Sequence, residues 1–363
     1  MSTPFRCTSI RTASPSGPSR TSRRISPPRG PVCARCVSTA RAAPTSTAPS
    51  ARPESTASAG TERSAAAAPG TLPRPGPAPY AGPVAVIVEL VTYPIKGCAG
   101  VRLPEAELTD AGLRHDRSFM VTDTEGVFRS QRRDPRLALI RPALDAGATG
   151  EGLRMTLAAE GAGSLGFAVD TEGPRRAVTL FKNSFLGIDQ GEAAAEWLSG
   201  VLGKPSRLVR VPPEHDRVTD GIIPGTSGYA DSSALHVLSR SSLDLLHERL
   251  AKREAPPLPM DRFRPNVVVD GWETPHTEDR ARRVRAGTTL WGWTKPAVRC
   301  AVTTVDQSAG VREGPEPLRT LADYRRGEGG GVVFGAKFSV LRGGRLAVGD
   351  ELLVDEWAPP EPD

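Results

Sequence analysis

The chain has 363 residues, including 35 prolines and 24% charged residues, and its length suggests two domains and a tail. Residues 1–80 hold 11 arginines, no lysine and two acidic residues, Glu54 and Glu62, so the net charge of this segment is +9. The net charge of the whole chain is +6, so that of the remaining residues is −3. Because the positive charge is confined to one segment, it does not indicate a nucleic-acid-binding fold.

Cysteine content and apolar runs exclude two further classes of protein. Five cysteines are too few for a disulfide framework, and their odd number favours a reducing compartment. The longest apolar run, residues 84–91, is interrupted by Glu89 and is far shorter than the roughly 20 residues that a membrane helix needs. We therefore expect a cytoplasmic protein that binds neither membrane nor nucleic acid.

Residues 1–80 are predicted to be a disordered tail. They consist mainly of Ser, Thr, Pro, Ala, Gly and Arg, and such a segment cannot bury enough apolar surface to offset its ordering entropy. Cys33 and Cys36 form a single Cys-x-x-Cys pair, and without a second pair we interpret them as no metal site.

Residues 81–205 are predicted to form one β-rich domain. Closely spaced short strands with Gly and Asp turns favour a barrel or sandwich over a βαβ sheet. A helix is expected over residues 192–202, because its apolar residues recur on one face and Gly203 follows. Residues 123–126 are the expected turn of a hairpin. The predicted strands are 84–91, 101–108, 118–121, 127–131, 137–140, 153–158, 165–169 and 177–181.

Residues 206–358 are predicted to form a second, mixed domain, which makes the chain α+β and β-rich. Ser239 or Ser241 is expected to cap a helix that ends at Leu250, and a helical stripe covers residues 316–326. The polar, Gly- and Pro-rich residues 212–228 are expected to form a surface loop over the domain interface. The predicted strands are 235–238, 267–269, 297–305, 332–341 and 351–354.

Common catalytic motifs are absent from the sequence, so chemistry must be sought in single residues. There is no GxGxxG, GxxxxGK[ST], HExxH or GxSxG. The five histidines show no metal-ligand spacing, and we interpret His236 and His247 as packing or solvent residues.

Cys300 is the residue that we single out. It follows Arg299 inside the strand predicted for residues 297–305. A thiolate is a soft ligand suited to a high-valent metal, and the adjacent guanidinium favours the ionised form. The alternative is a cysteine that is simply buried in a strand. We interpret Cys98 as a packing residue.

Cations and their neighbours stand at the ends of three other predicted strands. Arginine and lysine side chains bind phosphates, and asparagine offers a paired donor and acceptor to a heterocycle. Pro265 is expected to hold the residue before it in an extended conformation. Taken alone, each such cation is more often a surface charge than a ligand-binding residue. The residues are Lys96, Gly97, Arg117, Arg264 and Asn266.

Taken together, the motifs of this chain resemble the MOSC family, in the form that has an N-terminal MOSC β-barrel domain followed by a MOSC domain. The resemblance extends from about residue 84 to residue 354. The motifs are residues 93–96 (YPIK), 112–117 (GLRHDR), 229–233 (YADSS), 263–266 (FRPN) and 299–306 (RCAVTTVD).

The resemblance implies a pyranopterin molybdenum cofactor and no pyridoxal phosphate. Cys300 would be the molybdenum ligand and the catalytic residue, whereas Asp306 belongs to the motif with no role assigned. The residues that would contact the cofactor are Lys96, Gly97, Arg117, Asp231, Ser233, Arg264, Asn266 and Arg299.

The implied function is that of a molybdenum-dependent oxidoreductase that reduces N-hydroxylated or N-oxidised small molecules. No cysteine follows Cys300, so we expect electrons to come from a separate ferredoxin, flavoprotein or cytochrome. The alternative function is that of a sulfur or molybdenum-cofactor carrier that uses Cys300.

Overall fold

The computed structural model describes residues 84–146 and 152–359. The predictions made for residues 1–80, including the disordered tail and the Cys33–Cys36 pair, lie outside the described residues. The described part is rich in strands and contains the α-helices α1 (Glu192–Leu202), α2 (Arg240–Ala251) and α3 (Leu318–Leu321). The predicted β-rich α+β class is confirmed.

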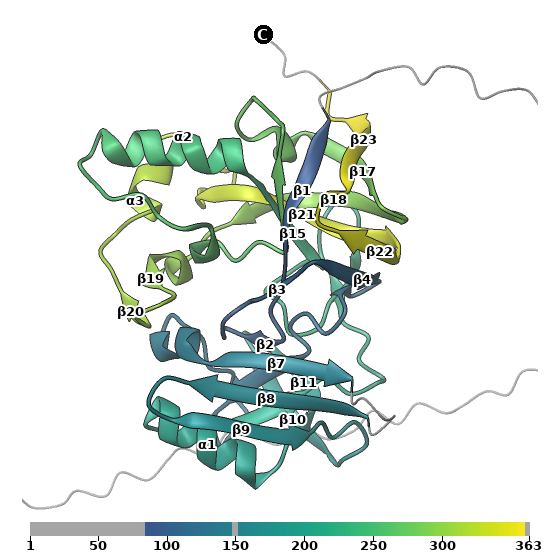
Figure 1. Ribbon diagram of the computed structural model, residues 1–363, viewed down its shortest axis with the longest axis vertical. Helices are drawn as coiled ribbons and strands as arrows, with labels where there is room; N and C mark the ends of the chain where they lie inside the picture. The colour runs from purple at the N-terminus through teal and green to yellow at the C-terminus, as the bar shows by residue number, and fades with distance from the viewer. Residues whose placement is uncertain (1–83, 147–151, 360–363) are drawn as a thin grey trace, which may run out of the picture. The chain divides into compact units, whose positions relative to one another are not determined.

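Seven of the described strands form a closed barrel (Figure 1). The chain's first described strand, β1, closes it by pairing with β16, and all neighbouring strands run antiparallel except β15 and β16. Residues from both predicted domains therefore form this barrel. In order around the barrel, the strands are β16 (Val267–Asp270), β15 (Leu235–Ser239), β21 (Val333–Arg342), β18 (Thr289–Val298), β17 (Ala281–Ala286), β23 (Glu351–Trp357) and β1 (Ala85–Thr92).

The core of the barrel is apolar. Trp291 and Phe338 are at most 1% exposed, and their rings meet edge to face with centroids 6.2 Å apart. Each fully buried apolar side chain of this size contributes about 1.5–3 kcal/mol. Ile87, Val237 and Val284 belong to the same cluster.

Two smaller sheets and α1 lie together in the lower part of Figure 1. Leu198 and Leu202 of α1 share one apolar cluster with Phe119, Val121 and Met155 of the sheets. The larger sheet has the order β10 (Arg175–Leu180), β11 (Asn183–Asp189), β12 (Arg207–Arg210), β6 (Phe119–Thr122) and β2 (Ile95–Lys96). The smaller has the order β7 (Arg141–Ala146), β8 (Leu153–Ala159) and β9 (Gly163–Ala168).

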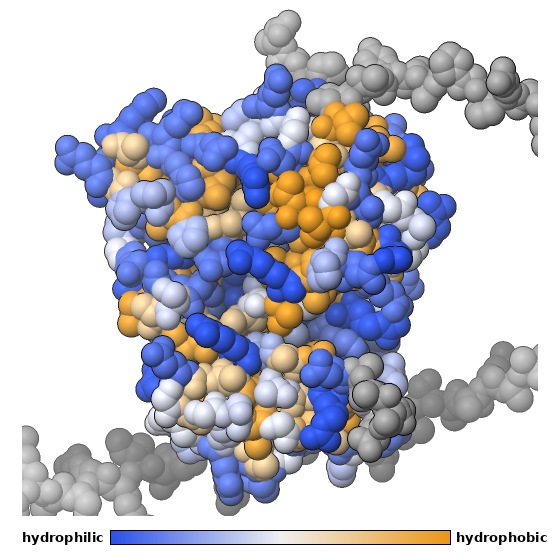
Figure 2. Space-filling model, viewed as in Figure 1, coloured by the Kyte–Doolittle hydropathy of each residue, from blue (hydrophilic) through white to orange (hydrophobic). Residues whose placement is uncertain are grey.

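Helix α2 begins after Ser239, one of the two caps predicted for it. The Ser239 side chain accepts a hydrogen bond from the backbone N–H of Ser242 at 3.2 Å. Its apolar face carries Leu243, Leu246 and Leu250, while its other face is hydrophilic in Figure 2. None of the described helices has the length and apolar character needed to cross a bilayer.

Short elements connect these parts of the molecule. Strand β4 pairs with β22, so that a late segment of the chain joins an early one. The short strands are β3 (Val101–Leu103), β4 (Glu105–Thr109), β5 (Gly112–Leu113), β13 (Val218–Thr219), β14 (Gly225–Thr226), β19 (Val305–Asp306), β20 (Val311–Arg312) and β22 (Gly344–Ala347). The 3-10 helices are η1 (Pro135–Leu139), η2 (Met260–Arg262), η3 (Thr277–Asp279) and η4 (Ala301–Thr304).

Several local predictions were wrong. Residues 137–139 of the strand expected over 137–140 belong to the 3-10 helix η1, because Pro135 stands at the first position of η1, where proline favours a helical turn. The helix expected over 316–326 is limited to α3. The turn expected at 123–126 is present and brings residues 127–129 beside β6, but their pairing is limited to a bridge between Thr122 and Phe128 and flanking backbone hydrogen bonds, so no strand extends over 127–131. The loop expected over 212–228 contains the β13–β14 hairpin.

Candidate active site

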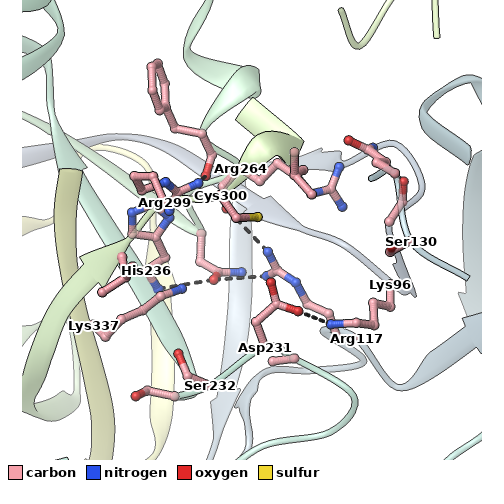
Figure 3. Close-up of a pocket in the computed structure, with 18 of the residues that line it drawn as sticks. Lys96, Arg117, Ser130, Asp231, Ser232, His236, Arg264, Arg299, Cys300 and Lys337 are labelled. Atoms are coloured by element: carbon pink, nitrogen blue, oxygen red, sulfur yellow. Dashed lines mark hydrogen bonds and ion pairs between the residues drawn. The ribbon is translucent and has the colours of Figure 1, made fainter. Parts of the chain in front are cut away.

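All nine site residues predicted from the sequence line one pocket of about 320 Å³ (Figure 3). They come from strand ends and the turns beside them: β2, the approach to β6, the approach to β15, the η2–β16 turn and the end of β18. The pocket therefore combines segments more than 200 residues apart in the chain. The residues are Lys96, Gly97, Arg117, Asp231, Ser233, Arg264, Asn266, Arg299 and Cys300.

Cys300 stands in a turn, with its sulfur pointing into the pocket (Figure 3). It is half-buried and forms no disulfide. The prediction that Cys300 lies within a strand was wrong, because β18 ends at Val298 and η4 follows. The Thr303 hydroxyl donates to the Cys300 carbonyl at 3.0 Å, a local bond that competes with strand pairing.

Cys98 differs from Cys300 in every relevant respect. It is fully buried in the apolar cluster around α1, and burial raises the pKa of its thiol to about 12. A neutral, buried thiol acts as a small hydrophobic side chain. Cys98 is thus a packing residue, as its sequence setting suggested.

Two pocket arginines, the buried Arg264 and the half-buried Arg299, keep buried N–H groups that have no partner in the described part of the chain. These groups are Nη2 of Arg264 and Nε of Arg299. Burial lowers the pKa of both guanidinium groups, that of Arg299 to about 10. Because a buried cation without a counter-charge is costly, this arrangement favours a bound anion.

Arg117 and Arg264 hold strained backbone conformations. Their φ angles are 47° and 56°, a region that bulky residues rarely adopt. The expectation that Pro265 keeps Arg264 extended was therefore wrong. Both guanidinium carbons lie 4.2 Å from the centroid of the Tyr93 ring, and the Arg117 Nη2 group donates to the Arg264 carbonyl at 3.3 Å. These contacts hold the strained conformation in place.

Lys96 and Asp231 form an ion pair across the pocket (Figure 3). Burial lowers the pKa of Lys96, although Asp231 opposes that shift. The neighbouring Lys96 ammonium lowers the pKa of Asp231, whose side chain is 64% exposed. The Lys96 Nζ atom also lies 5.3 Å and 5.8 Å from the ring centroids of Phe181 and Phe128.

The Asn266 side chain forms hydrogen bonds with other residues of the protein. Its Oδ1 accepts from Arg117 Nη1 at 3.1 Å and from the backbone N–H of His236 at 3.2 Å, and its Nδ2 donates to the Val91 carbonyl at 3.1 Å. Asn266 thus orients Arg117 and joins three barrel strands.

Gly97 and Ser233 occupy positions with little freedom. Gly97 has a φ of 83°, and a Cβ at that position would lie 3.3 Å from Leu137 Cδ1, so a side chain there is disfavoured. The Ser233 hydroxyl shares a hydrogen bond with the Thr294 hydroxyl at 2.9 Å.

Sequence reasoning missed several residues that line the pocket, among them Gln131, Arg132, Lys295 and Lys337, and it interpreted His236 as packing. Lys337 interrupts the apolar residues at the start of β21, but a charge within a strand does not by itself indicate a pocket. Burial, with Arg299 and Arg117 nearby, lowers the pKa of Lys337 to about 7.

Within residues 84–146 and 152–359, no three His, Cys, Asp or Glu side chains are grouped so that they could hold a metal ion. A metal bound beside Cys300 would therefore take its other ligands from a bound organic group. The pocket fits such a group, because it offers one soft sulfur and unpartnered arginine donors for a phosphate.

Comparison with known proteins identifies two domain models in the chain. The MOSC N-terminal beta barrel domain matches residues 84–205, and the MOSC domain matches residues 224–353. The chain belongs to the MOSC family. This confirms the resemblance inferred from the sequence motifs, and the MOSC family is associated with the molybdenum cofactor.

Several relatives of this MOSC protein are similar over most of its length. Mitochondrial amidoxime-reducing component 1 of Homo sapiens is 32% identical over 285 residues, which are 74% of this chain and 82% of that protein. Mitochondrial amidoxime reducing component 2 of Rattus norvegicus is 32% identical over 289 residues, with the same coverage. Molybdenum cofactor sulfurase of Danio rerio is 29% identical over 273 residues, covering 70% of this chain and 32% of that protein.

Proposed function

We propose that this MOSC protein is a molybdenum-cofactor-binding oxidoreductase that reduces N-hydroxylated or N-oxidised small molecules with electrons from a separate donor protein. The observation that carries the proposal is the half-buried Cys300 thiol facing a pocket that also holds unpartnered arginine donors. The names of the amidoxime-reducing relatives support the substrate class.

Each residue of the proposed site has a role that follows from its chemistry. Cys300 would hold the metal through sulfur, and Arg264 and Arg299 would receive the cofactor phosphate with their free N–H groups. Arg117 would add a third guanidinium, oriented by Asp116 at 2.6 Å and by Asn266. The bound cofactor would supply a metal that changes oxidation state as the substrate loses oxygen.

Lys96, Asp231, Gly97 and Ser233 would shape the rest of the binding surface. The Lys96–Asp231 pair fixes the distance between two sides of the pocket, and the backbone of Gly97 permits close approach of a ligand. The Gly97 carbonyl is held by Gln131 Nε2 at 2.6 Å. These residues bind and orient rather than react.

The electron donor is proposed to be a ferredoxin, flavoprotein or cytochrome. The described residues contain two cysteines, Cys98 and Cys300, whereas an iron–sulfur cluster needs four cysteine ligands. The cytoplasmic location suggested by the cysteine content also stays a prediction.

Metal analysis and turnover test this proposal together. Full-length protein should be produced in a host that makes the molybdenum cofactor, analysed for molybdenum, and assayed for amidoxime reduction with an artificial electron donor. We expect about one molybdenum per chain and measurable reduction. Absence of molybdenum and of turnover would contradict the proposal.

A carrier role is the second candidate, and the similarity to molybdenum cofactor sulfurase favours it. In that role Cys300 would bear a persulfide or hold the cofactor for delivery. A persulfide donor transfers its outer sulfur to a thiol and leaves as a thiol itself, so mass spectrometry after incubation with such a donor would show a persulfide on Cys300 and none on the buried Cys98. Molybdenum-dependent turnover without such a persulfide would exclude the sulfur-carrier role.

A further inference from the structure

Lys337 is a pocket cation that the motifs of the family do not include. It lies on β21, is half-buried and lines the pocket beside His236 and Arg299. Within the described part of the chain, its ammonium group makes no hydrogen bond or ion pair. Lys96 and Lys295, in contrast, pair with Asp231 and Asp220.

Strand pairing places Lys337 in a row of cationic or titratable residues. His236 of β15 lies opposite Lys337 on one side, and Lys295 of β18 lies opposite it on the other. A register shift between Trp293 and Lys295 changes the pairing of β18 at this point. Because like charges directly opposite each other destabilise a sheet, this row costs stability in the free protein.

No carboxylate of the described pocket is left to neutralise Lys337. Asp231, the carboxylate that lines the pocket, is engaged by Lys96, and Asp116, which lies outside the pocket lining, is engaged by Arg117. Burial and the nearby cations Arg299 and Arg117 lower the pKa of Lys337 to about 7, although Asp231 and Asp116 oppose that shift. An unpaired cation in such surroundings is stabilised when an anion binds.

We propose that Lys337, with Lys295 beside it, forms an anion subsite for a carboxylate or phosphate group, separate from the unpartnered donors of Arg264 and Arg299. The anion can come from an acidic substrate or from the cofactor itself. The assignment of the anion to a substrate rests on the proposed function, whereas the existence of the subsite does not.

Competitive acetylation of the full-length protein tests the subsite directly. The chain has six lysines, so the labelling rate of each can be followed by peptide mass spectrometry near neutral pH, with and without inorganic phosphate. We expect phosphate to slow the labelling of Lys337 several-fold and to leave the exposed Lys182 unchanged. Equal rates for Lys337 with and without phosphate would overturn the proposal.

Two variants distinguish the sources of the anion. Lys337→Gln should raise the KM of an N-hydroxylated carboxylate substrate about tenfold and leave that of its methyl ester unchanged, while Lys337→Arg restores most of the difference. A loss of bound molybdenum with equal KM values would instead assign the anion to the cofactor. Unchanged KM values and unchanged molybdenum would overturn the subsite.

Lys252→Gln is the matched control, because Lys252 is exposed at the end of α2 and outside the pocket. It should match the wild type in labelling, in molybdenum content and in both KM values. If the protein holds no molybdenum and shows no turnover, the proposed function fails, but the acetylation experiment still decides the subsite.

Discussion

The barrel core and the pocket are built from the same strands but follow opposite rules. On β21, Phe338 is buried in the apolar core, whereas the ammonium group of its neighbour Lys337 faces the pocket and has no partner among the described residues. This is possible because successive side chains of a strand point to opposite faces. In the core, the polar Nε1 of Trp291 is satisfied by the Thr289 hydroxyl at 2.7 Å, although Nε1 of Trp293 has no partner among the described residues.

The pocket departs from these rules at several positions. Arg264 and Arg299 keep unpartnered donors, and Arg117 and Arg264 hold positive φ angles. Local rules broken without internal compensation are typical of functional sites. The core therefore stabilises the fold, whereas the pocket keeps donors and cations available for a ligand and lowers the stability of the free protein. Substitutions in the two regions should therefore separate folding from binding.

The largest effect on folding is expected from the core. Trp291→Ala should lower the free energy of unfolding by about 3–5 kcal/mol, because it leaves a cavity in the fully buried cluster. Denaturant titration measures the change. Val348→Ala is the control, since this side chain is 44% exposed and should change stability by less than about 0.5 kcal/mol. Equal effects of the two substitutions would contradict the assignment of the core.

In the pocket, Arg264→Ala should weaken cofactor binding by about 1.5–3 kcal/mol and change the unfolding free energy less. Arg117→Ala should weaken binding similarly, with an added loss of stability because it leaves the buried Asp116 unpaired. Lysine at either position should restore binding only in part. Molybdenum content and denaturant titration measure both effects, and full occupancy in both alanine variants would exclude these residues from the site.

Lys337→Met should change how stability depends on pH. The pKa of Lys337 is about 7 in the folded chain and near 10.4 when unfolded, so between these values the unfolded state binds more protons and stability rises with pH. Below about pH 7 Lys337 is protonated in both states, and the folded state bears the full cost of the unpaired cation. The variant should lose this rise, and its free energy of unfolding at neutral pH should be higher by on the order of 1–2 kcal/mol. This is less than the whole pKa shift would give, because solvent screens the half-buried side chain. Parallel stability curves for wild type and variant would contradict the prediction.

The smallest effect concerns strain at Phe181. This residue has a φ of 59° in the tight turn between β10 and β11, and its ring contacts Phe128 with centroids 4.9 Å apart. Phe181→Gly should relieve strain but lose that contact, for a net stability change within about 1 kcal/mol. It should also weaken anion binding, because Lys96 loses a neighbouring ring.

Glu254→Gly is the control for Phe181→Gly. Glu254 also has a positive φ, 56°, but it is exposed after α2 and outside the pocket. Glu254→Gly should raise the free energy of unfolding by about 0.5–1 kcal/mol and leave phosphate affinity unchanged. Equal phosphate affinity in both glycine variants would show that Phe181 does not act on Lys96.

The sequence predicted the pocket better than it predicted the local structure around it. The family motifs identified Cys300 and eight other residues that the fold brings to one pocket. They did not reveal the turn at Cys300, because the hydrogen bonds of Thr303 and Thr304 to nearby carbonyls compete with the strand propensity of this segment. Apolar spacing was informative where it was regular, as in α1.

Long-range pairing explains most of what was missed. Strand β1 closes a barrel whose other strands follow residue 234, and periodicity within one segment carries no information about such pairing. Lys337 and Lys295 were missed for the same reason, since a charge in a strand signals a pocket only when the neighbouring strands are known.

The central claim is that Cys300 holds the metal whereas Cys98 is a packing residue, and a pair of serine substitutions tests it most directly. Cys300→Ser should abolish reduction and change the spectroscopic signature of the bound molybdenum, with little loss of stability because the side chain is half-buried. Cys98→Ser should retain activity but cost about 1–3 kcal/mol of stability, because it places a hydroxyl in a fully buried apolar site. Wild-type turnover in Cys300→Ser with molybdenum still bound would contradict the account.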